Sequence, residues 1–420
     1  MIYEIQKRPF VRPLFCWITG IVLQVCFPLQ QLSFILLLPV IVVVVISLFS
    51  SNRQIPSYQA RWIWGMLLFS LLIFLAIQAT ALAEQRLGVI SDPGYLRESA
   101  RRMQEFMVSK LDNLPLDNKE KSILATITVN YRKAMSWDLR NQFAATGVAH
   151  LLSVSGFHVG IVATVLTTLF SVLPNSMVFR WIRFILLLLL VWAFAYIAGL
   201  SAPSVRAALM FSIYLTGRQL QYRPDRYNTL AAAAFCMLVY NPFNLFDVGF
   251  QLSFIAVFFI LYLQPRFYRL IEVRNPLLAV PWGVLTVTVA AQIGTVFLCC
   301  YYFGEVSTVF LFTNLVLSLL ATVLIPLVLC YMLLPTGIPG YEWLETLIAF
   351  LTKAFLGIVD RFSHLPGATL SLRFDFITMI GLYIVLGLIL YYFYSKRVRI
   401  LLTGLFLFLF VLCRQLILQY

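Results

Sequence analysis

The stretch VFLFTNLVLSLLATVLIPLVLCYMLL, residues 309–334, decides the fold class. It contains no charged residue and exceeds the ~20 residues that a helix needs to cross a bilayer. Similar apolar runs recur at residues 14–27, 32–49, 62–82, 147–173, 181–199, 203–216, 228–240, 248–263, 281–303, 343–359, 376–394 and 400–416. The sequence therefore predicts an all-α polytopic membrane protein with roughly 11–13 transmembrane helices, some of them short or broken.

The composition excludes a soluble multidomain protein. Of 420 residues, 61% are hydrophobic and only 11% are charged, whereas soluble proteins contain about 25% charged residues. The net charge is +14, which on a soluble protein would suggest nucleic-acid binding. In a membrane protein we attribute it mainly to the enrichment of lysine and arginine in cytoplasmic loops.

The positions of the basic residues predict the orientation. If every apolar run spans and the N-terminus is cytoplasmic, the short outside loops hold only Arg361 and Arg373. Sixteen basic residues fall inside: Lys7, Arg8, Arg12, Arg53, Arg61, Arg180, Arg183, Arg218, Arg223, Arg226, Arg266, Arg269, Arg274, Lys396, Arg397 and Arg399. This asymmetry is the one that positive cytoplasmic loops produce. Residues 343–359 carry Glu345 and Lys353, so a helix lying in the membrane interface is the alternative for that run.

Residues 83–146 differ from the rest, because they hold ten basic and eight acidic residues. Leu96, Met103, Met107 and Leu111 follow a helical spacing, and a second helix is expected to begin near Asp117 and run to residue 143. We therefore divide the chain into N-terminal membrane helices (1–82), a small extracytoplasmic helical segment (83–146) and a membrane domain (147–420). The first apolar run lacks a small-residue cleavage site and is expected to be retained. The seven cysteines lie in apolar runs without metal-ligand spacing.

Residues 146–160, TGVAHLLSVSGFHVG, concentrate polar side chains within a run without charge. A continuous helix from Gly147 would place His158 ~18 Å below the membrane surface. Polar groups at that depth usually face protein or water. Gly156 and Gly160 form a GxxxG pair, for which helix packing is the alternative explanation.

Two further polar clusters interrupt apolar runs. In residues 199–208, GLSAPSVRAA, a helix is expected to start around Pro203, which leaves Arg206 either buried or reaching to the surface. In residues 241–254, NPFNLFDVGFQLSF, Asp247 precedes a helix that carries Gln251 and Ser253. Under the predicted topology both clusters lie near the outer face, so we expect Arg206 and Asp247 to pair. Residues 217–228 mix arginines with tyrosines, which suits single-stranded nucleic acid as well as an ordinary cytoplasmic loop.

These three clusters together resemble the competence domain of the ComEC family, over roughly residues 124–334. The resemblance implies a channel in the inner (plasma) membrane of a bacterial cell that carries single-stranded DNA into the cytoplasm during natural transformation. It implies no catalysis and neither a cofactor nor a metal. Separate proteins would then serve as DNA receptor, nuclease and cytoplasmic ATPase. The positions that match the family's motifs, expected to line or shape the path, are His150, Ser153, Ser155, Gly156, His158, Pro203, Arg206, Asp247, Gln251 and Ser253.

Two features depart from the family pattern, and two other functions stay open. Residues 83–146 are too few for the OB-like domain of many members. A metallo-β-lactamase-like cluster is not expected with only three histidines. The chain breaks at Gly156, Pro203 and Pro326 equally suit a small-molecule or ion transporter with discontinuous helices. An intramembrane serine hydrolase is less favoured, because Ser155 and His158 are neighbours without an acidic residue nearby in sequence.

Overall fold

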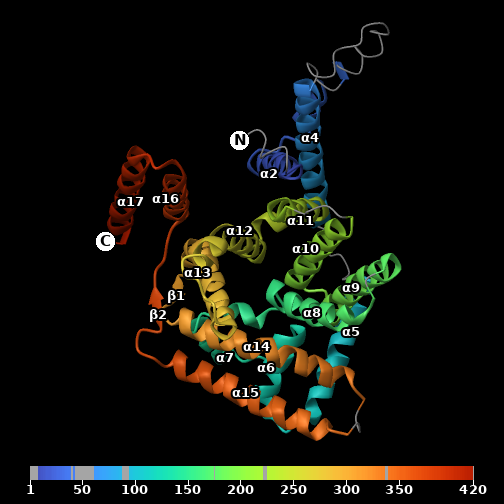
Figure 1. The fold of residues 1–420 in the computed structure, drawn as a ribbon. Coiled ribbons are helices and arrows are strands. Elements are labelled where there is room, and N and C mark those ends of the chain that lie inside the picture. Colours follow the sequence, from blue (N-terminus) through green and yellow to red (C-terminus); the bar gives the residue numbers. More distant parts are fainter. Residues whose placement is uncertain are drawn as a thin grey trace. The chain divides into compact units, whose positions relative to one another are not determined.

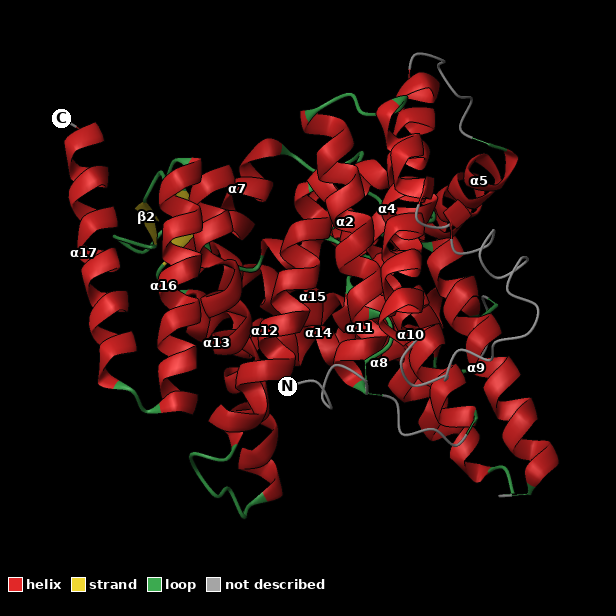
Figure 2. Ribbon diagram, turned by 90° about the horizontal axis from the view of Figure 1, so that it is seen from above, coloured by secondary structure: helices red, strands yellow, loops and turns green. Residues whose placement is uncertain are grey.

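A computed structural model describes residues 8–38, 41–42, 61–87, 94–174, 176–220, 225–335 and 339–419. The described chain is helical apart from one antiparallel pair of strands (Figure 2). Strands β1 (Glu305–Ser307) and β2 (Thr369–Ser371) pair with Glu305 opposite Ser371. The predicted all-α class is confirmed.

Seven described helices are long and apolar enough to cross a membrane. They cover Gly65–Gln85, Met177–Ile197, Val248–Tyr268, Pro276–Tyr302, Phe310–Leu333, Phe376–Ser395 and Val398–Gln415. Two shorter apolar helices, Val11–Cys26 and Gly156–Val172, accompany them. The protein is therefore a multi-pass membrane protein.

The chain divides into two compact units, each built from separate stretches. Unit 1 combines Met1–Ser109 with Val154–Phe254, and unit 2 combines Lys110–Ser153 with Ile255–Tyr420. Helix α12 (Val248–Tyr268) contributes its first turns to unit 1 and the remainder to unit 2. The division at residues 82 and 146 stays a prediction.

Unit 1 is a set of packed helices with an aromatic and aliphatic core. Its other elements are α2 (Val11–Cys26), η1 (Leu32–Leu37), α4 (Arg61–Leu87), α5 (Tyr95–Ser109), α8 (Gly156–Leu169), η4 (Phe170–Val172), α9 (Met177–Ile197), α10 (Ala202–Gln219), α11 (Arg226–Tyr240) and η5 (Pro242–Phe246). Trp17, Ile21, Leu238 and Phe250 are among the residues that form its core. Helices α2 and α4 approach closely at Gly20, where a Cβ would lie 2.5 Å from the Cβ of Ala76.

The N-terminus is attached to the start of α11. Arg8 Nε lies 3.2 Å from Asp225 Oδ1, and the Phe10 backbone N–H donates to Asn228 Oδ1 at 2.9 Å. Asp225 Oδ1 also caps α11 by accepting from the Asn228 N–H at 2.9 Å. The starts of α2 and α11 thus lie together, in agreement with their assignment to the same side. Lys7, Arg53, Arg223, residues 43–49 and part of 217–228 lie outside the described residues.

Unit 2 contains a short helix, α6 (Asn118–Val129), that is largely buried. Its other elements are η2 (Lys110–Asn113), α7 (Trp137–Ala145), η3 (Ala149–Leu152), α13 (Pro276–Tyr302), α14 (Phe310–Leu333), α15 (Tyr341–Ser363), α16 (Phe376–Ser395) and α17 (Val398–Gln419), with both strands. Helix α6 starts where predicted, with Asp117 and Glu120 forming a capping box. It buries every residue from 122 to 129 and packs against α14 and α15.

The second predicted helix does not run to residue 143. It ends at Asn130, whose φ of 59° is left-handed, and α7 begins after the N-cap residue Ser136. An asparagine tolerates this conformation better than most residues, so it terminates helices. The segment is therefore two helices, α6 and α7.

Two contacts together contradict the predicted order of membrane crossings. Lys110 Nζ donates to the Met332 carbonyl oxygen at 2.7 Å, at the C-terminal end of α14. Near the other end, Thr313 Oγ1 donates to the Thr146 carbonyl oxygen at 2.6 Å. Residues 110–146 thus contact both ends of α14, whereas the topology placed these residues outside and the end of α14 inside. Figure 1 shows α14 and α15 as two long helices side by side, with α6 and α7 next to them.

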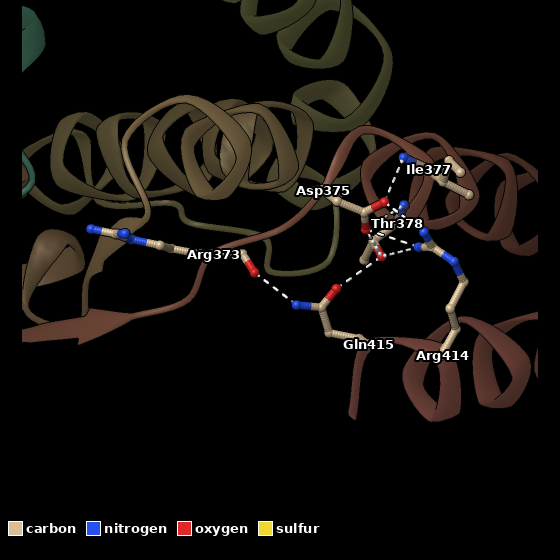
Figure 3. A network of polar contacts seen from close by, with 6 residues as sticks. All are labelled: Arg373, Asp375, Ile377, Thr378, Arg414 and Gln415. Atoms are coloured by element: carbon tan, nitrogen blue, oxygen red, sulfur yellow. Dashed lines mark hydrogen bonds and ion pairs between the residues drawn. The ribbon is translucent and has the colours of Figure 1, made fainter. Parts of the chain in front are cut away.

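Helices α16 and α17 form a hairpin closed by a polar network (Figure 3). Arg414 donates from Nη1 to Asp375 Oδ1 at 2.9 Å and from Nη2 to Asp375 Oδ2 at 2.8 Å. Asp375 also accepts from the backbone N–H groups of Ile377 and Thr378, so it caps α16. Hydrogen bonds from Arg414 and Thr378 hold the pKa of Asp375 well below its usual range.

Candidate functional site

The first polar cluster is divided between an irregular segment and a helix start. The predicted continuous helix from Gly147 is wrong, because α8 begins at Gly156. Gly147 has a φ of +74°, and a Cβ there would lie 2.5 Å from the Cβ of Phe310. The short helix η3 follows and carries an exposed His150, and Ser153 is half-buried in extended backbone after it. The ~18 Å depth deduced for His158 along an unbroken helix therefore no longer applies.

Ser155 and His158 form the N-terminus of α8. Ser155 Oγ accepts from the Phe157 N–H at 3.3 Å, and His158 Nδ1 accepts from the Ser155 N–H at 3.3 Å. Ser155 Oγ also lies 3.2 Å from His158 Nδ1. This is a capping box with histidine at the third position, and His158 is fully buried. The contact that suggested a nucleophile and a base therefore has a structural role, which is to satisfy N–H groups at a helix end.

Gly156 and Gly160 do not serve close helix packing in the described structure. A Cβ at either position would have nothing within 4 Å, apart from neighbouring chain atoms. A GxxxG interface brings another helix against its glycines. The packing alternative for these two glycines is therefore not supported within the described part of the protein.

The second cluster starts α10 after a left-handed turn. Gly199 and Leu200 have φ values of +71° and +47°, and Pro203 lies in the first turn of α10, as predicted. The fully buried Ser204 donates to the Ser201 carbonyl oxygen at 2.8 Å and accepts from Ser201 Oγ at 2.9 Å. These bonds satisfy polar groups at the helix end and place Arg206 half a turn further along α10.

The third cluster ends α11 and starts α12. Asn241 Oδ1 accepts from the Phe243 N–H at 3.1 Å, which begins η5. Asp247 Oδ1 accepts from the Phe250 N–H at 2.7 Å and so caps α12. Gln251 Nε2 donates to the Leu245 carbonyl oxygen at 2.9 Å, and Ser253 is half-buried one turn beyond Gly249.

Arg206 and Asp247 join the second and third clusters, and their predicted pairing is confirmed. Arg206 Nη1 lies 3.8 Å from Asp247 Oδ1. Arg206 is only 4% exposed, which excludes the alternative that it reaches out to the surface. The 54% exposure of the Asp247 side chain leaves the carboxylate accessible.

Unit 1 gathers eight of the ten predicted residues. Ser155, Gly156 and His158 lie on α8, which packs against α10, and α10 carries Pro203 and Arg206. Asp247, Gln251 and Ser253 lie at the start of α12, which the ion pair connects to α10. His150 and Ser153 belong to unit 2. That the ten residues surround one wet passage stays a prediction.

Gly249 is a residue at this ion pair that sequence reasoning missed. A Cβ at this position would lie 3.1 Å from Asp247 Oδ1 and 3.5 Å from Arg206 Nη2. A side chain here would crowd the Asp247 carboxylate and would be in van der Waals contact with the guanidinium, which lies beside the first turn of α12. Its position two residues after a helix-capping aspartate was the signal available in the sequence.

Comparisons with known proteins identify the family of the chain. The profile of the competence protein family matches residues 127–396, which include all ten predicted positions. ComE operon protein 3 of Bacillus subtilis (strain 168) is 28% identical over 286 residues, covering 64% of this chain and 34% of that protein. Recombination protein 2 of Haemophilus influenzae is 29% identical over 128 residues, covering 29% of this chain and 16% of that protein.

The chain thus spans about a third of the length of the first of these relatives. No solved structure matches it. The profile match extends over more than half of the chain and includes α7 to α16. The chain belongs to the competence protein family.

Proposed function

We propose that this protein is a channel in the bacterial inner membrane that carries single-stranded DNA into the cytoplasm during natural transformation. The observation that carries the proposal is the competence family match over residues 127–396, which includes the three polar clusters. The long apolar helices provide the membrane domain that such a channel needs. We further infer that the N-terminus is cytoplasmic and that the chain itself catalyses no covalent chemistry.

Unit 1 contains positive groups that could compensate the phosphate charge of a DNA strand. A strand brings one negative phosphate per nucleotide, and such a charge is strongly disfavoured in hydrocarbon unless it is compensated. Arg206 is a cation held inside the protein, and the starts of α8, α10 and α12 add the positive ends of helix dipoles. A DNA receptor, a nuclease and a cytoplasmic ATPase would be supplied by other chains.

A complementation assay tests the proposal. A transformable bacterium that lacks its own channel gene would express this chain, and uptake of labelled DNA into a nuclease-protected form would be measured. We expect uptake by the natural sequence and its loss in Arg206→Gln. Arg414→Gln is the matched control, since it also breaks an arginine–aspartate pair at a helix start. Failure of the natural sequence, with equal membrane expression and the other competence proteins present, would contradict the proposal.

A transporter for small solutes or ions is the second candidate, because the chain breaks before Gly156 and around Pro203 also suit discontinuous transport helices. Proteoliposomes separate the two. A path for a strand must open to ~10 Å or more, judged by the ~6 Å and ~12 Å widths of the DNA grooves. Passage of a labelled oligonucleotide supports the channel, whereas passage of small ions alone supports the transporter.

A further inference from the structure

Arg206 has fewer partners than a buried guanidinium requires. It is 4% exposed, and its Nε has no hydrogen-bond partner among the described residues. Its nearest carboxylate oxygen lies at 3.8 Å, beyond the 2.7–3.2 Å range of a direct N–H···O bond. A guanidinium offers five N–H donors, and buried charges are normally paired and fully hydrogen-bonded. The Arg206 guanidinium therefore has N–H donors that could still bind an acceptor.

Arg414 shows what a complete pair looks like in the same chain. It also faces an aspartate that caps a helix, yet it binds both carboxylate oxygens, at 2.8 and 2.9 Å (Figure 3). Arg414 is partly exposed, with 28% of its side chain accessible, whereas Arg206 is buried. The more deeply buried arginine is thus the less completely paired one, which a purely structural ion pair does not explain.

A second group of donors meets Arg206 at the same place. The guanidinium lies beside the first turn of α12: a Cβ built on Gly249 would be 3.5 Å from Nη2 and 3.8 Å from Nη1. A helix of 21 residues presents N–H groups and a positive dipole end there. Asp247 now occupies this position, with Oδ1 on the Phe250 N–H and 54% of its side chain exposed. A cation and a helix N-terminus together are the usual means of binding phosphate.

We propose that Arg206 and the first turn of α12 form a binding site for a phosphodiester group, and that the Asp247 carboxylate occupies it when no strand is present. A backbone phosphate displaces the carboxylate toward solvent and takes over its contacts. The site is never left with an unbalanced charge, because one anion replaces another. Gly249 leaves the room that the larger phosphate needs. This inference rests on the proposed function and assigns a place where the strand contacts the protein.

Binding measurements with purified full-length protein in lipid nanodiscs test the site. The probes are a labelled twelve-residue deoxythymidine strand, its uncharged methylphosphonate analogue and inorganic phosphate. In Asp247→Asn, asparagine still caps the helix but no longer competes with phosphate. We expect this variant to bind the charged strand about threefold or more tightly than the natural protein, with the uncharged analogue unaffected. The control Asp375→Asn alters the other capping aspartate and should leave both affinities unchanged.

Gly249→Ala gives a second, independent measurement in which Asp247 is retained. The added methyl group narrows the site, so the charged strand should bind several-fold more weakly. Unchanged or weaker binding by a folded Asp247→Asn overturns the proposal, as does unchanged binding by Gly249→Ala. Tighter binding of inorganic phosphate without tighter binding of the strand also overturns it, since the site would then serve free phosphate. Uptake by the natural sequence in the complementation assay shows separately whether the proposed function holds.

Discussion

Single residues at helix starts determine most of the local structure of the predicted site. Ser155, Asp247 and Asp375 each accept a hydrogen bond from a backbone N–H at the start of α8, α12 or α16. The first four N–H groups of a helix lack partners within it, so these side chains replace water that a membrane domain does not supply. Polar residues that sequence reasoning assigned to a path therefore also have a stabilising role.

Ser155 should contribute to stability as the N-cap of α8. We expect Ser155→Ala to lower the free energy of unfolding by about 1 kcal/mol, with Ser155→Asp retaining most of it. Denaturant titration of the protein in detergent measures both. A fluorophosphonate probe should not label the natural protein at Ser155. Labelling that disappears in Ser155→Ala would instead support the hydrolase interpretation.

Gly147 should tolerate no side chain. Its φ of +74° disfavours other residues, and a Cβ would lie 2.5 Å from the Phe310 Cβ. We expect Gly147→Ala to cost about 1–3 kcal/mol of unfolding free energy. Gly357→Ala is the control, since Gly357 lies inside α15 and a Cβ would meet nothing within 4 Å. A Gly147→Ala protein as stable as the control would show that the turn relaxes without cost.

The contacts of helices α14 and α15 indicate an arrangement that hydropathy alone does not predict. Helix α14 is the most apolar of the candidate spans, yet its two ends contact Lys110 and Thr146, which both belong to the segment 110–146. Helix α15 buries Ile348, Thr352 and Phe355 on one face, and it packs against α14, α6 and α7. These contacts favour a hairpin of α14 and α15 that stays on one side of the membrane. If neither α14 nor α15 crosses the membrane, α16 still starts on the side that the charge asymmetry predicts.

Cysteine accessibility tests this hairpin. In a variant without the seven native cysteines, Glu342→Cys and Lys119→Cys should react with the same membrane-impermeant maleimide from the same side. Glu342 lies at the start of α15 and Lys119 at the start of α6, and both residues belong to unit 2. Reaction from opposite sides would show that α14 crosses the membrane after all.

The α16–α17 hairpin should depend on Asp375 over most of the pH range. Its pKa is lower in the folded protein than in the unfolded chain, so its contribution is complete above the unfolded value of ~3.9. The contribution is lost as pH falls through the lower folded pKa. We expect the melting temperatures of the natural protein and Asp375→Asn to differ by a constant amount from pH 8 to about 5. That difference should shrink only at strongly acidic pH, and shrinkage near neutral pH would contradict the assignment.

At the scale of the whole molecule, the charge asymmetry predicts which helix ends share a side of the membrane. Arg8 and Asp225 hold the starts of α2 and α11 together, as expected for two segments that begin on the same side. The turn between α16 and α17 holds Lys396 and Arg397, at the opposite end of the hairpin from the Asp375–Arg414 pair. The long apolar helices other than α14 make the protein multi-pass whichever orientation is adopted.

Labelling in intact cells tests the predicted orientation. In the cysteine-free background, Arg269→Cys and Lys396→Cys should react with an impermeant maleimide only after the membrane is permeabilised. Both positions are exposed in the structure, so the membrane rather than burial would protect them. Lys119→Cys should react in intact cells. The reverse result would place the N-terminus outside.

The sequence by itself determined the all-α membrane class, most helix positions and the pairing of Arg206 with Asp247. In lipid, a long apolar segment satisfies its backbone hydrogen bonds by forming a helix. Two opposite charges expected near the same face of the membrane domain are predicted to pair, because a buried charge without a partner is costly. Only the tertiary structure decided that α8 begins at Gly156, that Gly249 lies against the Arg206–Asp247 pair, and that α14 contacts residues 110–146 at both ends. Hydropathy measures the affinity of a segment for an apolar environment. It does not distinguish lipid from protein, because an apolar helix face can be buried against either.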